Sequence, residues 1–395
     1  MSPAQRLLAF LVILSVAAVA LRAVSHRARI PYPVVLAAGG VLVGLIPGGR
    51  PSGVGSDLIL LAFVPGLVFQ ASISLDLGSL RRVVTPVTLL ATLGVAIVVV
   101  GAGAGFHLLL GLRWPDSFLL AAILAPTDPI AVVSVLRAVR APVVLVTSLE
   151  GESLFNDGTG VALFAALLAS VTSGNLSLAD VGGRFLLSTG GGLAIGAAAG
   201  LVGVLVLRTT KDASLEFLTT LTLAYGAYLA ADILGTSGIV AVVAAALVVV
   251  IARRRSPIHG EQVLEFWDLA GFLLNALLFL LIGSALPTRD VAGLAGSVAV
   301  GLVILIAVRV LAVYAILAAV DRRGRLIAWR QRPFVVWAGF RGALSVALAL
   351  SVTGRPGIDA KVPILAYGVV VLSLLFQGST IRPLARRLSP PAPAP

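Results

Sequence analysis

Apolar segments of about 20 residues recur along almost the whole chain, and this pattern limits its possible folds more than any other feature. A helix of that length spans the hydrocarbon core of a bilayer. Hydrophobic residues make up 59% of the 395 residues and charged residues only 12%, too few charges to cover the surface of a water-soluble fold. We therefore predict an all-α polytopic membrane protein.

The apolar pattern predicts about 13 transmembrane helices in a single transporter domain over residues 1–388, followed by a short Pro-rich tail, 389–395. The segment Leu7 to Ala20 has more basic residues after it than before it, so we interpret it as a retained first span and not as a cleaved signal peptide. The predicted spans are centred near residues 14, 40, 67, 97, 127, 158, 196, 223, 244, 275, 306, 342 and 370.

Basic residues are distributed unevenly between the two sets of loops. Of the 29 lysines and arginines, 20 lie in the loops after odd-numbered spans or in the C-terminal tail, and 7 lie in the opposite loops. Because cytoplasmic loops carry the excess of positive charge, we predict a multi-pass protein of the cell (inner) membrane with the N-terminus outside and the C-terminus in the cytoplasm. The net charge of +12 therefore indicates topology in a lipid bilayer and does not require nucleic acid as a partner.

The fifth span is interrupted at its middle by Pro126-Thr127-Asp128-Pro129. A carboxylate at that depth costs several kcal/mol by even the lowest estimates, so it needs a functional reason. The two prolines remove backbone donors and disfavour helix, which predicts an unwound segment with free carbonyl oxygens. Oxygen atoms without helical partners are suited to binding a cation.

The sixth span carries a second polar stretch, from Glu152 to Asp157. The spacing of helical residues places Ser153 and Asp157 on one edge, and Glu152 and Asn156 on the neighbouring edge. Together with Thr127 and Asp128 of the fifth span, these side chains make six polar groups that we expect to face one small place.

Arg309 and Arg341 lie near the centres of the eleventh and twelfth spans. A buried arginine without an acidic partner is strongly destabilising, so we expect both to pair with the three acids at that depth, Asp128, Glu152 and Asp157. Two positive and three negative charges leave one net negative charge. That charge suits one monovalent cation or one proton.

The predicted topology makes the fifth and twelfth spans cross the membrane in opposite directions, as it does for the fourth and eleventh and for the sixth and thirteenth. The twelfth span is broken by Gly339 and Gly342 on either side of Arg341. Opposed triplets whose central helices are broken are typical of inverted-repeat transporters, with the binding site between the broken crossing helices.

Other polar residues in the spans have simpler interpretations. Gln70, near the middle of the third span, either makes an interhelical hydrogen bond or binds an ion. Four acids lie near predicted span ends, where we expect them to be solvated: Glu216, Asp232, Glu265 and Asp268.

Several classes of site are excluded or disfavoured. The chain has no cysteine, which excludes disulfides and thiolate metal sites, and its three histidines lie near span ends without a His-Glu-x-x-His motif. The glycine run from Gly190 to Gly203 has neither the strand nor the Lys-Ser pair of a phosphate loop, so we interpret it as a packing surface. We expect no enzymatic activity and no cofactor.

The two broken spans and the polar stretch between them resemble a known family. The segments Ala125 to Val132, Glu150 to Gly160 and Phe340 to Ser345 are similar to the signatures of bacterial sodium/proton antiporters of the cation:proton antiporter-1 type, the NhaP-like branch. The resemblance extends from about Ile59 to Leu384 and includes the segment Asn275 to Gly283.

This resemblance implies specific roles at the break. Asp128 and Asp157 would be the ion-binding carboxylates, and the Thr127 carbonyl and the Ser153 hydroxyl would complete the shell of a transported Na⁺. Asn156 would belong to the same ion- and proton-binding motif.

The resemblance also implies a Glu152–Arg309 ion pair and a homodimer. Family members have a moving core, here about residues 84–173 and 290–380, and a dimerisation scaffold formed by the remaining spans. The chain departs from the family pattern at Gln70, where a glutamate is usual.

The function that these features favour is exchange of Na⁺, Li⁺ or K⁺ for H⁺ by alternating access, with Asp157 holding either a proton or a cation. Because Asn156 cannot ionise, we expect the exchange to be electroneutral. The alternatives are a K⁺-selective K⁺/H⁺ antiporter, a cation channel, and an intramembrane aspartyl hydrolase that uses Asp128 and Asp157 as a dyad.

Overall fold

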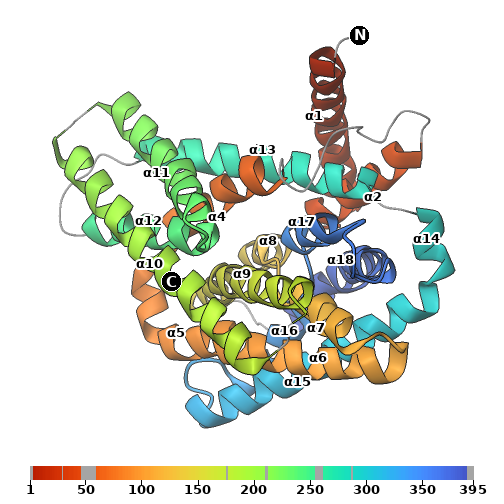
Figure 1. The fold of residues 1–395 in the computed structure, drawn as a ribbon. Helices are drawn as coiled ribbons and strands as arrows, with labels where there is room; N and C mark the ends of the chain where they lie inside the picture. Colours follow the sequence, from red (N-terminus) through yellow and green to blue (C-terminus); the bar gives the residue numbers. More distant parts are fainter. Residues whose placement is uncertain are drawn as a thin grey trace.

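The structure is a computed structural model that describes residues 3–28, 30–45, 59–174, 177–209, 212–253, 261–285 and 288–388. All regular structure within these ranges is helical, which confirms the all-α prediction for the described residues (Figure 1). The predicted Pro-rich tail, 389–395, lies outside them.

The main helices are α1 (Pro3–Ala28), α2 (Tyr32–Leu45), α4 (Val64–Ile73), α5 (Leu77–Leu89), α6 (Val95–Leu110), α7 (Trp114–Ile123), α8 (Ile130–Ala138), α9 (Val143–Thr172), α10 (Leu178–Thr209), α11 (Ala213–Ile233), α12 (Gly238–Arg253), α13 (Glu261–Ala285), α14 (Thr288–Gly293), α15 (Ala295–Val320), α16 (Arg332–Trp337), α17 (Ala343–Val352) and α18 (Lys361–Leu388).

Six helical segments in the described part of the chain are long and apolar enough to cross a membrane by themselves. Four shorter apolar helices occupy further predicted spans, and a π-helical turn, Leu90–Gly94, joins α5 to α6. The count of about 13 spans therefore stays a prediction. The six long segments are Leu77–Leu110, Val143–Thr172, Leu178–Thr209, Glu261–Ala285, Ala295–Val320 and Lys361–Ala385.

Two of the predicted spans are broken near their middle. The helix α7 ends at Ile123, and α8 begins at Ile130 after a non-helical segment that contains both prolines. The helix α16 ends at Trp337, and α17 begins at Ala343. Both breaks fall where the sequence placed them.

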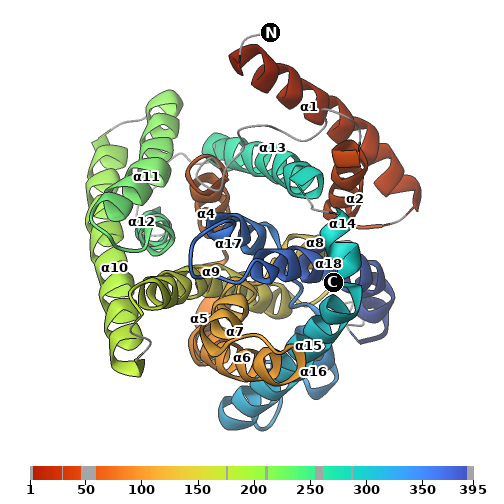
Figure 2. The same ribbon diagram turned by 45° about the vertical axis from the view of Figure 1, so that its right-hand side comes forward.

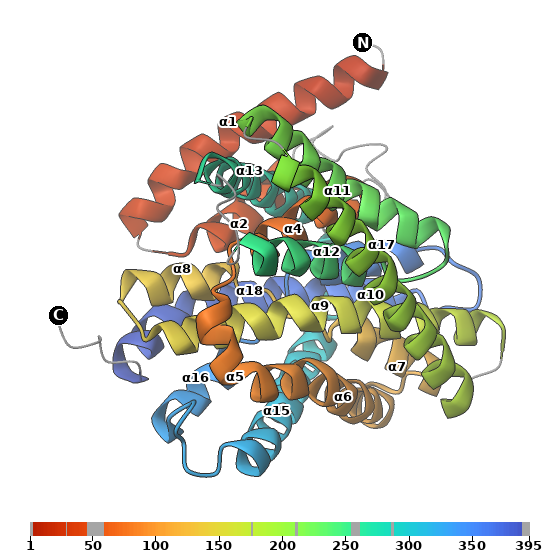
Figure 3. The ribbon, with the colours of Figure 1, turned by 90° about the vertical axis from the view of Figure 1, so that its left-hand side faces the viewer.

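The helices are arranged around α9, which passes through the middle of the molecule. In Figure 3, α4, α12 and α13 lie on one side of α9, while α5, α6 and α15 lie on the other. Figure 2 shows α10, α11 and α12 gathered at one edge and α1 and α2 at another, with α8, α17 and α18 between them. This arrangement brings the two broken helices to the centre.

The glycine run of α10 packs closely against α12, as the sequence predicted. A Cβ atom added at Gly196 or Gly200 would collide with the backbone of α12, and one at Gly192 with the carbonyl of Ser237, just before α12. The four-residue spacing places these glycines along one stripe of the helix, which lets the two backbones approach each other closely.

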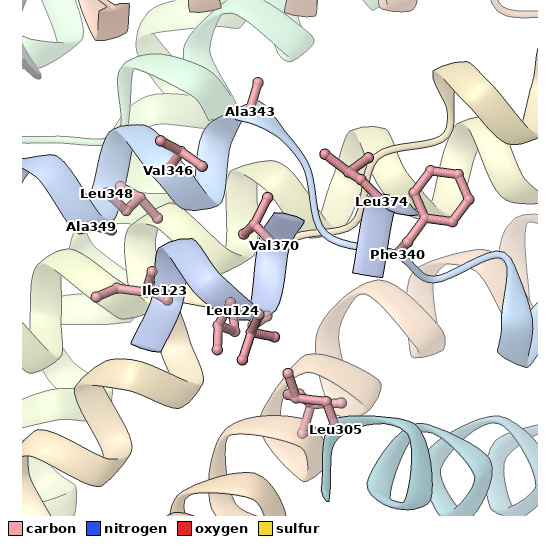
Figure 4. Close-up of a cluster of buried hydrophobic side chains, with 14 of the residues drawn as sticks. Ile123, Leu124, Leu305, Phe340, Ala343, Val346, Leu348, Ala349, Val370 and Leu374 are labelled. Atoms are coloured by element: carbon pink, nitrogen blue, oxygen red, sulfur yellow. The ribbon is translucent and has the colours of Figure 1, made fainter. Parts of the chain in front are cut away.

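An apolar cluster encloses the two breaks on the side of α15 and α18 (Figure 4). Leu124 and Phe340, one from each break, are fully buried, and Leu305 of α15 is 1% exposed. This packing excludes water from that side of the broken segments, so the polar backbone groups that face it need partners within the protein.

One acid differs from its expected setting. Glu216, in the first turn of α11, is 1% exposed and not solvated. It lies beside Thr220 and Arg253 on the wall of a small cavity, and it interacts electrostatically with Arg253. The sequence placed Glu216 near a span end but could not show that α12 covers it.

Candidate functional site

A cavity of about 570 Å³ lies between two groups of helices at the centre of the molecule. One wall is formed by α4 and α13, and the other by the α7–α8 break, α8, α9 and the start of α17. Four of the residues predicted to bind the ion line it, Thr127, Asp128, Ser153 and Asp157, and so does Gln70.

The two broken segments cross beside this cavity. The Asp128 backbone N–H donates a hydrogen bond to the Phe340 carbonyl at 3.0 Å. The Asp128 carboxylate accepts the Ile130 N–H at 2.9 Å, which satisfies a donor at the start of α8. A Cβ at Gly342 would collide with the Asp128 side chain, so the close crossing requires glycine there.

Helix α9 holds the first break in place through two neutral side chains. Asn156 donates from Nδ2 to the Thr127 hydroxyl at 2.7 Å, and its Oδ1 accepts the Thr127 N–H at 3.3 Å. The Ser153 hydroxyl donates to the Thr127 carbonyl. Because a carbonyl oxygen has two lone pairs, Thr127 keeps one acceptor site for an ion.

Asp157 has a different environment from the other carboxylates of the site. Among the described residues no protein donor hydrogen-bonds to its side chain, which is one helical turn beyond Ser153 on the cavity wall. The Asp128 carboxylate is close enough to repel it electrostatically. A partly buried carboxylate without protein donors, beside a second carboxylate, can be neutralised by a proton or by a cation.

Glu152 forms an ion pair with Arg309 of α15, with Nη1–Oε1 and Nη2–Oε2 distances of 2.9 and 3.1 Å. Both side chains are less than 10% exposed. Arg309 also donates to the carbonyls of Val335 and Val336 at the end of α16, both at 3.2 Å. The pair therefore connects α9, α15 and the second broken helix.

The expectation that all six polar groups face one place is wrong for Glu152, which faces α15. Asn156 binds Thr127 of the break, although it does not line the cavity itself. The helical spacing identified the two edges of α9 correctly. It could not show that neighbouring edges meet different elements.

Arg341 also differs from the sequence-based expectation. Its guanidinium donates to the carbonyls of Ala125 at 2.6 Å and Pro126 at 3.4 Å, and no salt bridge to an acid occurs among the described residues. Its backbone N–H donates to the Ser373 hydroxyl at 2.9 Å. These carbonyls belong to the non-helical segment after α7, so they have no helical partner and are free to accept from the guanidinium in place of an acid.

The opposite wall of the cavity carries an acid whose position in the cavity the sequence did not reveal. Asp268 of α13, expected to be merely solvated, lines the cavity and accepts a hydrogen bond from Gln70 Nε2 at 3.0 Å. Gln70 thus makes a hydrogen bond between α4 and α13, as the first of its two interpretations predicted. The signal in the sequence is the spacing of Asp268, Gly271 and Asn275, which lie on one face of α13.

Comparisons with known proteins agree with this geometry. Residues 11–387 match the family model described as "Sodium/hydrogen exchanger, transmembrane". The Na⁺/H⁺ antiporter ApNhaP of Aphanothece halophytica is 34% identical over 96% of this chain and 74% of its own length. The Na⁺/H⁺ antiporter NhaP of Pseudomonas aeruginosa is 36% identical over 84% of this chain and 81% of its own length.

The fold is similar to that of a solved structure, the sodium proton antiporter MjNhaP1 from Methanocaldococcus jannaschii at pH 8. The TM-score is 0.79 at 22% identity, and the match covers 97% of this chain and 99% of that one. The extent of the family match and the identity to its relatives establish that the chain belongs to the sodium/hydrogen exchanger family.

Proposed function

We propose that this protein is a secondary antiporter that exchanges Na⁺ for H⁺ across the cell membrane, with Li⁺ and K⁺ as the other cations to be tested. The observation that carries the proposal is the Asp157 carboxylate, which lies in the central cavity without a protein donor and next to Asp128. Such a site binds a proton or a cation but not both well, so competition at one site couples the two fluxes.

The oxygen atoms around the cavity suit a monovalent cation. The carboxylates of Asp128 and Asp157, the Thr127 carbonyl and the Ser153 hydroxyl supply hard oxygen ligands from two elements, the break and α9. Asn156 orients Thr127 and does not line the cavity, so its role is to position a ligand.

The charge balance of the core supports electroneutral exchange. The Glu152–Arg309 pair cancels, and Asn156 carries no charge. Arg341 with Asp128 and Asp157 leaves one net negative charge, if these three groups are ionised. One Na⁺ or one H⁺ neutralises that charge, so each cycle would exchange one for the other.

The arrangement of the helices supports alternating access. The set α5–α6, α7–α8 and α9 and the set α15, α16–α17 and α18 each have a broken central member, and the cavity separates these sets from α4 and α13. We assign the two sets, about residues 84–173 and 290–380, to a moving core, and the other spans to a scaffold that forms a homodimer. The uneven distribution of basic residues supports an outside N-terminus and a cytoplasmic C-terminus.

Exchange by purified protein in proteoliposomes tests the function. With a pH-sensitive dye trapped inside Na⁺-free vesicles, addition of external Na⁺ should alkalinise the lumen, because Na⁺ entry is coupled to H⁺ exit. Li⁺ and K⁺ added in turn would give the selectivity. A response to K⁺ alone would favour the K⁺-selective alternative. Failure of all three cations to move protons would reject the proposed function.

We predict that the exchange equilibrium does not depend on membrane voltage, because one positive charge moves in each direction per cycle. Proteoliposomes would be clamped at different potentials with valinomycin and K⁺, and Na⁺ would be the transported ion. An equilibrium Na⁺ gradient that shifts with the imposed voltage would show net charge movement, and would contradict the assignment of Asn156 as the determinant of stoichiometry.

A further inference from the structure

The wall of the cavity formed by α4 and α13 carries its own set of oxygen atoms, separate from those of the broken helices. Asp268 Oδ1 accepts hydrogen bonds from Gln70 Nε2 at 3.0 Å and from the Ser74 hydroxyl at 3.5 Å. Gln70 Nε2 also approaches Ser74 Oγ at 3.4 Å. All three residues line the same cavity as Asp128 and Asp157.

Hydrogen-bond acceptors outnumber donors on this wall. Within the described parts of the chain, no protein donor reaches Asp268 Oδ2, Gln70 Oε1 or Asn275 Oδ1, and the last of these atoms is buried. An unsatisfied buried acceptor costs free energy unless a donor or a cation reaches it. Of the three oxygen atoms only Asn275 Oδ1 is buried, while Asp268 Oδ2 and Gln70 Oε1 belong to side chains that line the cavity. The excess of acceptors on one wall makes a local environment that favours a positive charge.

The charge of Asp268 is not cancelled by a neighbouring basic side chain. Across the cavity, the Glu150 carboxylate is bound to Arg137 at 2.7 Å, which neutralises it. No salt bridge joins Asp268 to a basic residue among the described residues, and its partners Gln70 and Ser74 are neutral. Asp268 is thus the acid on this side of the cavity whose charge remains available to an ion.

Asp268 lies toward the open end of the cavity. It is exposed, as is its neighbour Ser74 at the end of α4. Arg137, at the end of α8, borders the same region, and its side chain is 65% exposed. On α9, Asp157 is seven residues beyond Glu150, which places it about 10 Å deeper along the helix axis. An ion that enters from this end meets Asp268 before it meets Asp157.

We propose that Asp268, Gln70 and Ser74 form a second monovalent-cation site at the mouth of the cavity, on the scaffold wall. The carboxylate, the amide carbonyl and the hydroxyl supply oxygen ligands of the kind that bind Na⁺, and the site holds the ion before transfer to Asp128 and Asp157. This role in transport rests on the proposed antiport function, whereas the binding of a cation at Asp268 does not.

Because the site lies on α4 and α13, it stays with the scaffold when the core moves. Arg137, which lines the cavity at the end of α8, belongs to the loops with excess positive charge, so the mouth faces the cytoplasm in the proposed topology. The second site would therefore concentrate cations for the inward-facing cavity only.

Binding to a transport-deficient protein tests the site independently of exchange. The Asp128→Asn/Asp157→Asn variant would be purified in choline-containing buffer and titrated with Na⁺. We expect the ²³Na NMR line to broaden, because Na⁺ exchanges with the one weak site that remains. Adding Asp268→Asn should remove this broadening, while Glu265→Gln, an exposed acid of the same helix that does not line the cavity, should leave it unchanged. Equal broadening with and without Asp268, or none in the double variant, would overturn the proposal.

Transport by single variants gives the second measurement. In an otherwise unchanged chain, Asp268→Asn should raise the Na⁺ concentration for half-maximal exchange about fivefold, because the attraction of one charge across a partly hydrated cavity has an effect of that order. Gln70→Ala should raise it less, and Glu265→Gln should not change it. If Gln70→Ala and Asp268→Asn both leave the Na⁺ concentration for half-maximal exchange unchanged, the site plays no part in transport. Failure of the wild-type protein to exchange would reject the proposed function, and the binding result would remain valid.

Discussion

Replacing Asp157 by asparagine should abolish cation-driven proton exchange while the protein still folds. The substitution preserves the size of the side chain but removes the charge that a proton or a cation neutralises, and among the described residues no hydrogen bond of Asp157 is lost. Dye-based exchange in proteoliposomes measures the loss, and size-exclusion chromatography with a melting curve verifies the fold. Asp128→Asn should be nearly as severe, since it removes the charge of the second carboxylate that lines the cavity.

The matched control is Asp232→Asn, which neutralises an exposed acid in the last turn of α11. This variant should exchange at the wild-type rate, because Asp232 does not line the cavity. Exchange that persists in Asp157→Asn would exclude Asp157 as the shared site, whatever the control shows.

Breaking the Glu152–Arg309 pair should give the largest loss of stability of any single substitution in the core. Removing one partner leaves an uncompensated buried charge, which costs roughly 3 to 5 kcal/mol. Arg309→Met should cost more than Glu152→Gln, because it also leaves the carbonyls of Val335 and Val336 without a donor. The melting temperature of each single variant and of the double variant measures these effects.

In the double variant, part of the loss should be recovered, since neither charge remains buried alone. Arg184→Gln serves as the control, because the exposed Arg184–Asp180 pair of α10 should contribute less than about 1 kcal/mol. Strictly additive losses in the double-mutant cycle would contradict a direct interaction between Glu152 and Arg309.

The broken helices could be predicted from sequence because their causes are local. The prolines around Thr127 remove backbone donors whatever surrounds them. The glycines around Arg341 weaken a helix through their greater conformational freedom, which is also a local effect. Depth in the membrane limited the partners of Arg309 and Arg341 to three acids, and the resemblance to the antiporter family indicated Glu152 for Arg309. Depth alone could not assign the partner of Arg341.

The features that the sequence did not reveal depend on which helix faces which. Arg341 binds backbone carbonyls that lack helical partners because α7 has ended. The residues of α7 alone do not indicate that the helix ends beside Arg341. The sequence shows that Asp268 lies near the end of a predicted span, which indicates a solvated residue. It does not show that this face of α13 lines a cavity. Periodicity gives the face of a helix, and tertiary packing decides what that face meets.

The release of protons when Na⁺ binds tests competition at Asp157 most directly. Purified protein in weakly buffered detergent solution would receive NaCl or, as the ionic-strength control, choline chloride, with a pH indicator recording the response across a series of starting pH values. We predict that Na⁺ displaces protons from the wild-type protein, that choline does not, and that Asp157→Asn releases none. Undiminished release from Asp157→Asn, or no release from a wild-type protein that binds Na⁺, would contradict a single site shared by the two ions.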